Sequence, residues 1–146
     1  MSGPTAATDP AIAALAALEG ARAARTRPDE SEAAVRAALA LAPDDHTVRT
    51  AAYKFHFYAA RLAEALPHAE WVIGDAARTL GLSPDWRAVR PGDAAFDTLE
   101  PEPRLFLQAL LAWGWCHART GDLALGIEAM EKVAALDPHD RFGAAR

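Results

Sequence analysis

Residues 105–140 constrain the fold more than any other part of the chain, because they join two helical patterns through one turn. The stretch reads LFLQALLAWGWCHARTGDLALGIEAMEKVAALDPHD. Leu110, Trp113 and His117 are three and four residues apart, so they lie on one face of a first helix. The second half is also amphipathic and stops at an Asp-Pro pair. This pattern predicts a helical hairpin.

Four residues in this stretch favour a tight hairpin, two at its turn and two where its helices pack. Gly121 can adopt the positive φ that ends a helix, and Asp122 can cap the helix that follows. Gly114 and Gly126 are small enough to let the two helix backbones nearly touch. Any helical hairpin needs such parts, so the prediction depends on their joint register rather than on any one of them.

In this register the stretch resembles one tetratricopeptide repeat (TPR), a helical hairpin of about 34 residues. Pro138 falls on the proline that the family has near the repeat end, and Met130 and Val133 take core positions. His117 stands where the family usually has an aromatic residue. The resemblance implies an array of stacked hairpins whose first helices line a concave surface. TPR proteins are mostly adaptors, so it implies a binding role.

Two fainter copies of the pattern precede this repeat, over residues 12–45 and 46–79. Ser31 and Ala65 occupy the same small position, 34 residues apart. Gly126, at the equivalent position of the last repeat, follows Ala65 by 61 residues, so 27 extra residues separate the last two repeats. We therefore expect an all-α, TPR-like array of about three antiparallel hairpins, with a 27-residue insert before the last.

The insert spans about residues 80–106. Residues 83–89 predict a short helix that Pro91 and the glycine after it would end, and Pro101 and Pro103 predict a turn before the next helix. A long insert in a compact fold is often functional. The alternative is that it only covers the exposed face of the second repeat.

The sequence thus predicts six main helices and one short helix in a single domain over residues 9–146, after a disordered leader at 1–8. Asp44 is the expected N-cap of the third helix. The tail after Pro138 would begin a capping helix. The apolar face of the last helix would be covered by that tail, by a second copy of the chain in a homodimer, or by a partner.

Composition excludes several classes of function. The net charge is −5 with both signs mixed along the chain, which gives neither a nucleic-acid surface nor a polybasic membrane anchor. The N-terminus lacks a signal-peptide pattern, and no apolar run approaches the roughly 20 residues that span a bilayer. The single cysteine, Cys116, excludes an internal disulfide. The default expectation is a soluble, cytoplasmic, bacterial protein.

The residues that could carry chemistry do not form a recognisable motif. Cys116 and His117 are adjacent, so on a helix they point about 100° apart and cannot easily share one ion. His56 and His117 occupy the same repeat position and are interpreted as packing residues. Cys116 lies within an apolar helix, where a thiol is usually inert. We therefore expect no catalytic residue, no metal, no cofactor and no enzyme activity.

The remaining candidate site is the concave groove that the TPR resemblance implies. Aromatic side chains supply contact area there, and lysine or arginine can pair with a carboxylate. Alternatively, Phe57 and Trp115 pack only against the first repeat and the insert. The inward positions are Thr47, Thr50, Lys54, Phe57 and Tyr58 in the second repeat, and Gln108, Leu111, Trp115 and Arg119 in the third.

The expected function is a non-enzymatic adaptor or scaffold that holds a peptide or helix of another protein. A chaperone-type clamp for acidic peptide tails needs asparagine partners that are absent beside Lys54. One alternative is a TPR chaperone of the type III secretion class, which fits the size and charge but not the insert. The other is an accessory subunit that stabilises or completes a catalytic partner.

Overall fold

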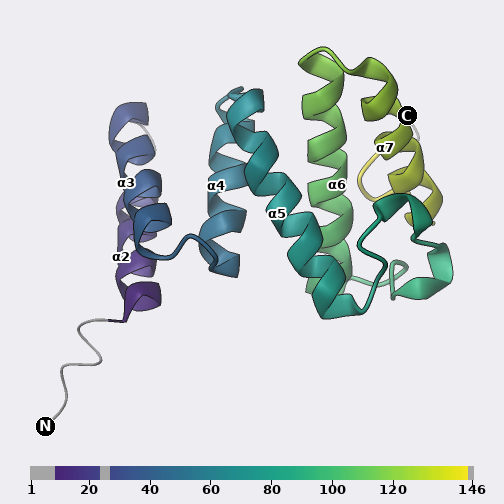
Figure 1. Cartoon of the computed structure of the whole chain (residues 1–146), viewed down its shortest axis with the longest axis horizontal. Helices are drawn as coiled ribbons and strands as arrows, with labels where there is room; N and C mark the ends of the chain where they lie inside the picture. Colours follow the sequence, from purple (N-terminus) through teal and green to yellow (C-terminus); the bar gives the residue numbers. More distant parts are fainter. Residues whose placement is uncertain (1–8, 24–26, 145–146) are drawn as a thin grey trace, which may run out of the picture.

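The computed structural model describes residues 9–23 and 27–144, and this part of the chain is all-α, without a strand. Its six α-helices pack as consecutive pairs, which stand side by side along the long axis of the molecule (Figure 1). The predicted class and the six main helices are confirmed; the expected leader at 1–8 lies outside the described residues. The helices are α2 (Pro10–Ala23), α3 (Pro28–Leu41), α4 (His46–Tyr58), α5 (Leu62–Leu80), α6 (Pro101–Arg119) and α7 (Leu123–Leu136).

Helix ends follow the local chemistry of their flanking residues. The Asp122 carboxylate accepts a hydrogen bond from the backbone N–H of Leu125 at 3.1 Å, and Gly121 has a φ of +116°, both as predicted. The predicted cap at Asp44 is wrong. Because α4 begins one residue later than that prediction requires, Asp45 is the cap and accepts from the N–H of Val48 at 3.1 Å.

The predicted close contact between the helices of the last hairpin is confirmed. A Cβ atom built on Gly126 would lie 2.5 Å from the backbone oxygen of Gly114, and one on Gly114 would lie 2.9 Å from the Cβ of Ala129. Ser31 and Ala65, which the repeat pattern predicts to be equivalent to Gly126, are also buried. Small, buried residues therefore recur at these three positions along the sequence.

Two cores of unequal size hold the helices together. The larger one extends from Tyr53 on α4 through α5 and α6 to Val133 on α7. The smaller one joins the first hairpin to α4 and consists of Ala14, Ala38 and Val48, with partly buried neighbours. Because these side chains are short, the first hairpin is attached through much less apolar surface than the other two.

The insert differs from its prediction in two places. Its helical segments are two 3₁₀ turns, η1 (Trp86–Ala88) and η2 (Pro91–Asp93), so the residue expected to end a helix begins a second turn instead. The insert also ends earlier than expected, because α6 begins at Pro101. The first N–H groups of a helix need no partner within it, so Pro101 and Pro103 fit inside the first turn.

The insert and the tail together cover the last hairpin. The Arg87 guanidinium donates two hydrogen bonds to Glu128 of α7, at 2.7 and 3.1 Å, and Lys132 donates to the Val89 carbonyl at 2.8 Å. The tail forms turns rather than the expected capping helix, and it packs Phe142 against the larger core. Figure 1 shows the insert as the teal segment that runs from α5 towards α7.

Candidate partner-binding groove

A cavity of about 450 Å³ lies between α4 and α6 on the side where the TPR resemblance predicts a binding surface. We call it the α4–α6 groove. The tail closes one side of it and α7 contributes to its wall. Its lining residues are Tyr53, Phe57, Tyr58, Gln108, Leu111, Ala112, Trp115, Met130, Phe142, Gly143 and Ala144.

The groove exists because α5 packs against both α4 and α6, whereas α4 and α6 make few contacts with each other. Apolar side chains cover the space that these two helices leave open. Tyr53 is buried in the larger core, and Phe57 and Leu111 are partly buried against it. The wall of the groove is therefore continuous with the larger core.

Aromatic side chains at the rim of the groove remain in contact with solvent. Tyr58 is 74% exposed and Trp115 is 43% exposed, which is unusual for large rings beside an apolar cavity. The Arg119 guanidinium lies over the Trp115 ring, 5.3 Å from its centroid, in a cation–π contact. These rings and one cation offer the kind of surface that protein interfaces favour.

Five of the residues predicted from the sequence line this groove: Phe57, Tyr58, Gln108, Leu111 and Trp115. Arg119 joins them through its contact with Trp115. Lys54 and Thr47 instead line a second cavity on the other side of Tyr58, and the half-buried Thr50 lines neither. The predicted single surface is thus divided in two.

Several groove residues were missed by the sequence reasoning. Tyr53 lies four residues before Phe57 and Ala112 four residues after Gln108, so a slightly wider helix face would have included them. Met130 was expected to face the core; it is partly buried and lines the wall of the groove. Phe142 carried no signal, because nothing in the sequence indicates that the tail returns to the groove.

The second cavity, of about 710 Å³, lies between the first hairpin and α4. We call it the α2–α4 cavity. Tyr58 is its one residue in common with the α4–α6 groove. Its lining residues are Leu18, Ala21, Pro28, Ser31, Val35, Thr47, Ala51, Lys54, Phe55, Tyr58, Ala59 and Arg61.

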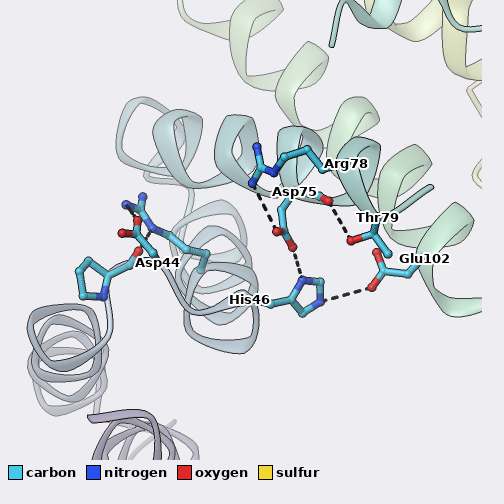
Figure 2. A network of polar contacts seen from close by, with 8 residues as sticks. Asp44, His46, Asp75, Arg78, Thr79 and Glu102 are labelled. Atoms are coloured by element: carbon cyan, nitrogen blue, oxygen red, sulfur yellow. Dashed lines mark hydrogen bonds and ion pairs between the residues drawn. The ribbon is translucent and has the colours of Figure 1, made fainter. Parts of the chain in front are cut away.

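A polar network joins α4, α5 and α6 near the start of α4. Figure 2 shows His46 between two carboxylates, with Asp75 2.7 Å from its Nδ1 and Glu102 3.8 Å from its Nε2. Asp75 also lies 3.4 Å from the Arg78 guanidinium. No group in the described part of the chain has the ligands to hold a metal ion. The network therefore acts as a polar link between helices that belong to two different hairpins.

A pair of histidines and the cysteine are packed into the helices. The rings of His56 and His68 are stacked with their centroids 5.7 Å apart. Burial lowers the pKa of both imidazoles, that of His68 to about 4, and the nearby charge of Arg49 adds to the effect on His68. Cys116 is fully buried, and burial raises the pKa of its thiol to about 11, so it is a poor nucleophile.

Comparison of the chain with protein-family models, with curated proteins and with solved structures gave no match. Within residues 9–23 and 27–144, no helix combines the length and the apolar character that crossing a membrane requires.

Proposed function

We propose that this chain is a TPR-like adaptor without chemical activity of its own, and that the α4–α6 groove binds an amphipathic helix of a partner protein. The observation that carries the proposal is the gathering of Phe57, Tyr58, Leu111 and Trp115, from helices more than 40 residues apart in sequence, around one open apolar cavity. Rings left exposed beside such a cavity are typical of sites that a partner covers.

The TPR-like part of the proposal is supported by the recurrence of small buried residues. Ser31, Ala65 and Gly126 lie where the repeat pattern requires a small side chain, and all three are buried. The contact of Gly114 with Gly126 is of the kind that the resemblance implies for the two helices of one repeat. These features support repeated hairpins despite the insert between the last two.

A helix suits this groove better than an extended peptide does. The walls are helices, whose backbone groups already form hydrogen bonds within each helix. They therefore offer no free backbone groups with which an extended peptide could pair. A helical ligand satisfies its own backbone and needs only apolar residues three and four apart to fill a cavity of about 450 Å³. The Gln108 amide and the Arg119 guanidinium could then orient its polar edge.

Site-specific photocrosslinking tests the proposal. The photoreactive residue p-benzoylphenylalanine would replace Trp115 in one variant and Ile127 in another. These two side chains are 43% and 45% exposed, but Ile127 lies on α7 and outside the groove. After irradiation in the native host, mass spectrometry would map the linked segment. A synthetic peptide of that segment would then be titrated into the parent chain and followed by circular dichroism.

We expect position 115, and not position 127, to link to a segment with an amphipathic helical pattern. The peptide should gain helix on binding, and Trp115→Ala should weaken its binding at least tenfold. Equal linking at both positions would place the partner elsewhere. A linked peptide that binds without gaining helix would contradict the helical ligand.

A further inference from the structure

The α2–α4 cavity is a second place where this chain can take a ligand. We infer that it binds a small amphiphilic carboxylate, a medium-chain fatty acid, with the acyl chain against α2 and α3 and the carboxylate at Lys54. The cavity shares only Tyr58 with the α4–α6 groove. Because Lys54 lines only the α2–α4 cavity, the inference does not require the α4–α6 groove to bind a partner.

The cavity follows from the alanine-rich sequence of the first hairpin. Where this hairpin meets α4, the fully buried residues are Ala14, Ala38 and Val48. Such short side chains do not fill the space between three helices, so a cavity of about 710 Å³ remains. Sites for small molecules usually enclose roughly 300–1,000 Å³, so the size suits a small ligand.

The walls favour an acyl chain over a peptide. Leu18, Val35 and Phe55 present apolar side chains to the cavity. The surrounding backbone is helical, and its amide and carbonyl groups are bonded along each helix. An extended peptide placed here would bury its own amides without partners, which is unfavourable, whereas an acyl chain has no polar group to satisfy.

Two of the polar residues at the cavity already have partners within the protein. The Arg61 guanidinium is paired with Glu32, and the Ser31 hydroxyl donates to the backbone carbonyl of Ala21 at 3.1 Å. These groups therefore contribute little uncompensated charge or hydrogen-bonding capacity to a ligand.

Lys54 differs from Arg61 and Ser31 in this respect. It is half-buried at the cavity, and within the described part of the chain it forms no ion pair. Thr47 and Tyr58 line the same face of α4, about two turns before and one turn after Lys54, and add polar groups along the cavity. An ammonium group without an ion-pair partner at an apolar cavity can pair with one carboxylate.

Isothermal titration calorimetry of the full chain with octanoate, decanoate and dodecanoate tests this inference, with dodecanol as the uncharged probe. All four would be used below the concentrations at which they aggregate. Burial of one methylene corresponds to about a fourfold gain in affinity, so binding should strengthen along the series by about that factor per methylene until the cavity is full. Dodecanoate should bind at least tenfold more tightly than dodecanol.

Two variants locate the ligand. Lys54→Met keeps the length of the side chain and removes its charge, so it should weaken dodecanoate at least tenfold and leave dodecanol unchanged. The matched control, Arg104→Met, removes an exposed cation outside both cavities and should change neither affinity. Ala51→Leu adds bulk to the wall and should weaken both probes.

The inference is wrong if dodecanoate does not bind, if dodecanol binds equally well, or if Lys54→Met leaves dodecanoate unaffected. It is also wrong if a short peptide with a free terminal carboxylate binds more tightly than dodecanoate. Should Ala51→Leu fail to fold, amide chemical-shift changes in the parent chain replace it. Changes confined to α2, α3 and α4 support the site, and changes centred on α6 and α7 contradict it.

Discussion

At the residue scale, Gly126 is the described glycine that leaves least space for a side chain. A Cβ atom there would lie 2.5 Å from the Gly114 oxygen and 2.8 Å from the Ala118 nitrogen, both of them backbone atoms that cannot rotate away. We predict that Gly126→Leu costs about 1–3 kcal/mol of unfolding free energy or more, since overpacked helices must move apart. Chemical denaturation measures the loss. Gly92→Ala is the matched control, because a Cβ at Gly92 meets nothing within 4 Å and should change stability little.

The stacked pair His56 and His68 sets a dependence of stability on pH. A histidine in the unfolded chain has a pKa near 6.5, whereas burial lowers the pKa of folded His68 to about 4. Above pH 6.5 the His68 imidazole is mostly neutral in both the folded and the unfolded chain, so its contribution to the free energy of unfolding is fully present. As the pH falls from about 6.5 towards 4, the unfolded chain takes up protons that the folded chain excludes, so the free energy of unfolding falls.

His68→Phe tests this dependence, because it keeps a ring against His56 and removes one titrating group. Urea unfolding would be measured for the variant and the parent at several pH values from 7.5 down to 4.5. We expect the variant to lose less stability than the parent over this interval. Parallel pH profiles for the two chains would show that His68 titrates in the same way in both states.

At the element scale, the insert is a structural part of the last hairpin. Phe96 is buried in the larger core, with its ring 6.0 Å from that of Phe106 on α6. We predict that Phe96→Ala costs about 3–5 kcal/mol, because it leaves a cavity in a rigid core. Arg87→Ala breaks an exposed ion pair with Glu128 and should cost less than about 1 kcal/mol. Thermal unfolding of both variants distinguishes an insert that packs into the core from one attached only by its surface charges.

The helices could be predicted because their signals are local. The turn at Gly121, the cap at Asp122 and the spacing of Leu110, Trp113 and His117 all act within one or two turns of chain. The packing of the insert could not be predicted in this way, because the contact of Phe96 with α6 depends on the position of the folded hairpin.

At the scale of the whole molecule, the first hairpin determines how the predicted site is divided. The sequence placed Lys54 and Tyr58 on one surface, since residues four apart share a helix face. In the structure the first hairpin packs beside α4 and forms the α2–α4 cavity, which Lys54 lines. Trp115 lines the α4–α6 groove instead, and Tyr58 lines both. The order of the helices could be predicted from the sequence pattern, but the fit between alanine-rich surfaces depends on tertiary packing.

This division leads to a last prediction about the proposed helix partner. Trp115 is an exposed aromatic residue of the groove and Arg119 lies against it, so Trp115→Ala removes both an apolar anchor and the support for the cation. Truncated anchors of this kind often cost about 2 kcal/mol of binding, a factor of roughly thirty. Arg119→Ala, which removes a charge at the rim, should weaken binding less, and the exposed Arg104→Ala should not weaken it.

Fluorescence anisotropy of a labelled partner helix measures these affinities, with the melting temperature of each variant recorded in parallel. Because Trp115 and Arg119 are exposed, the melting temperatures should stay close to that of the parent. If Trp115→Ala binds the helix as the parent does, the α4–α6 groove is not the binding surface. If Trp115→Ala instead lowers the melting temperature by many degrees, the Trp115 ring stabilises the core. The exposed side chains Leu123 and Ile127 of α7 then become the next surface to test.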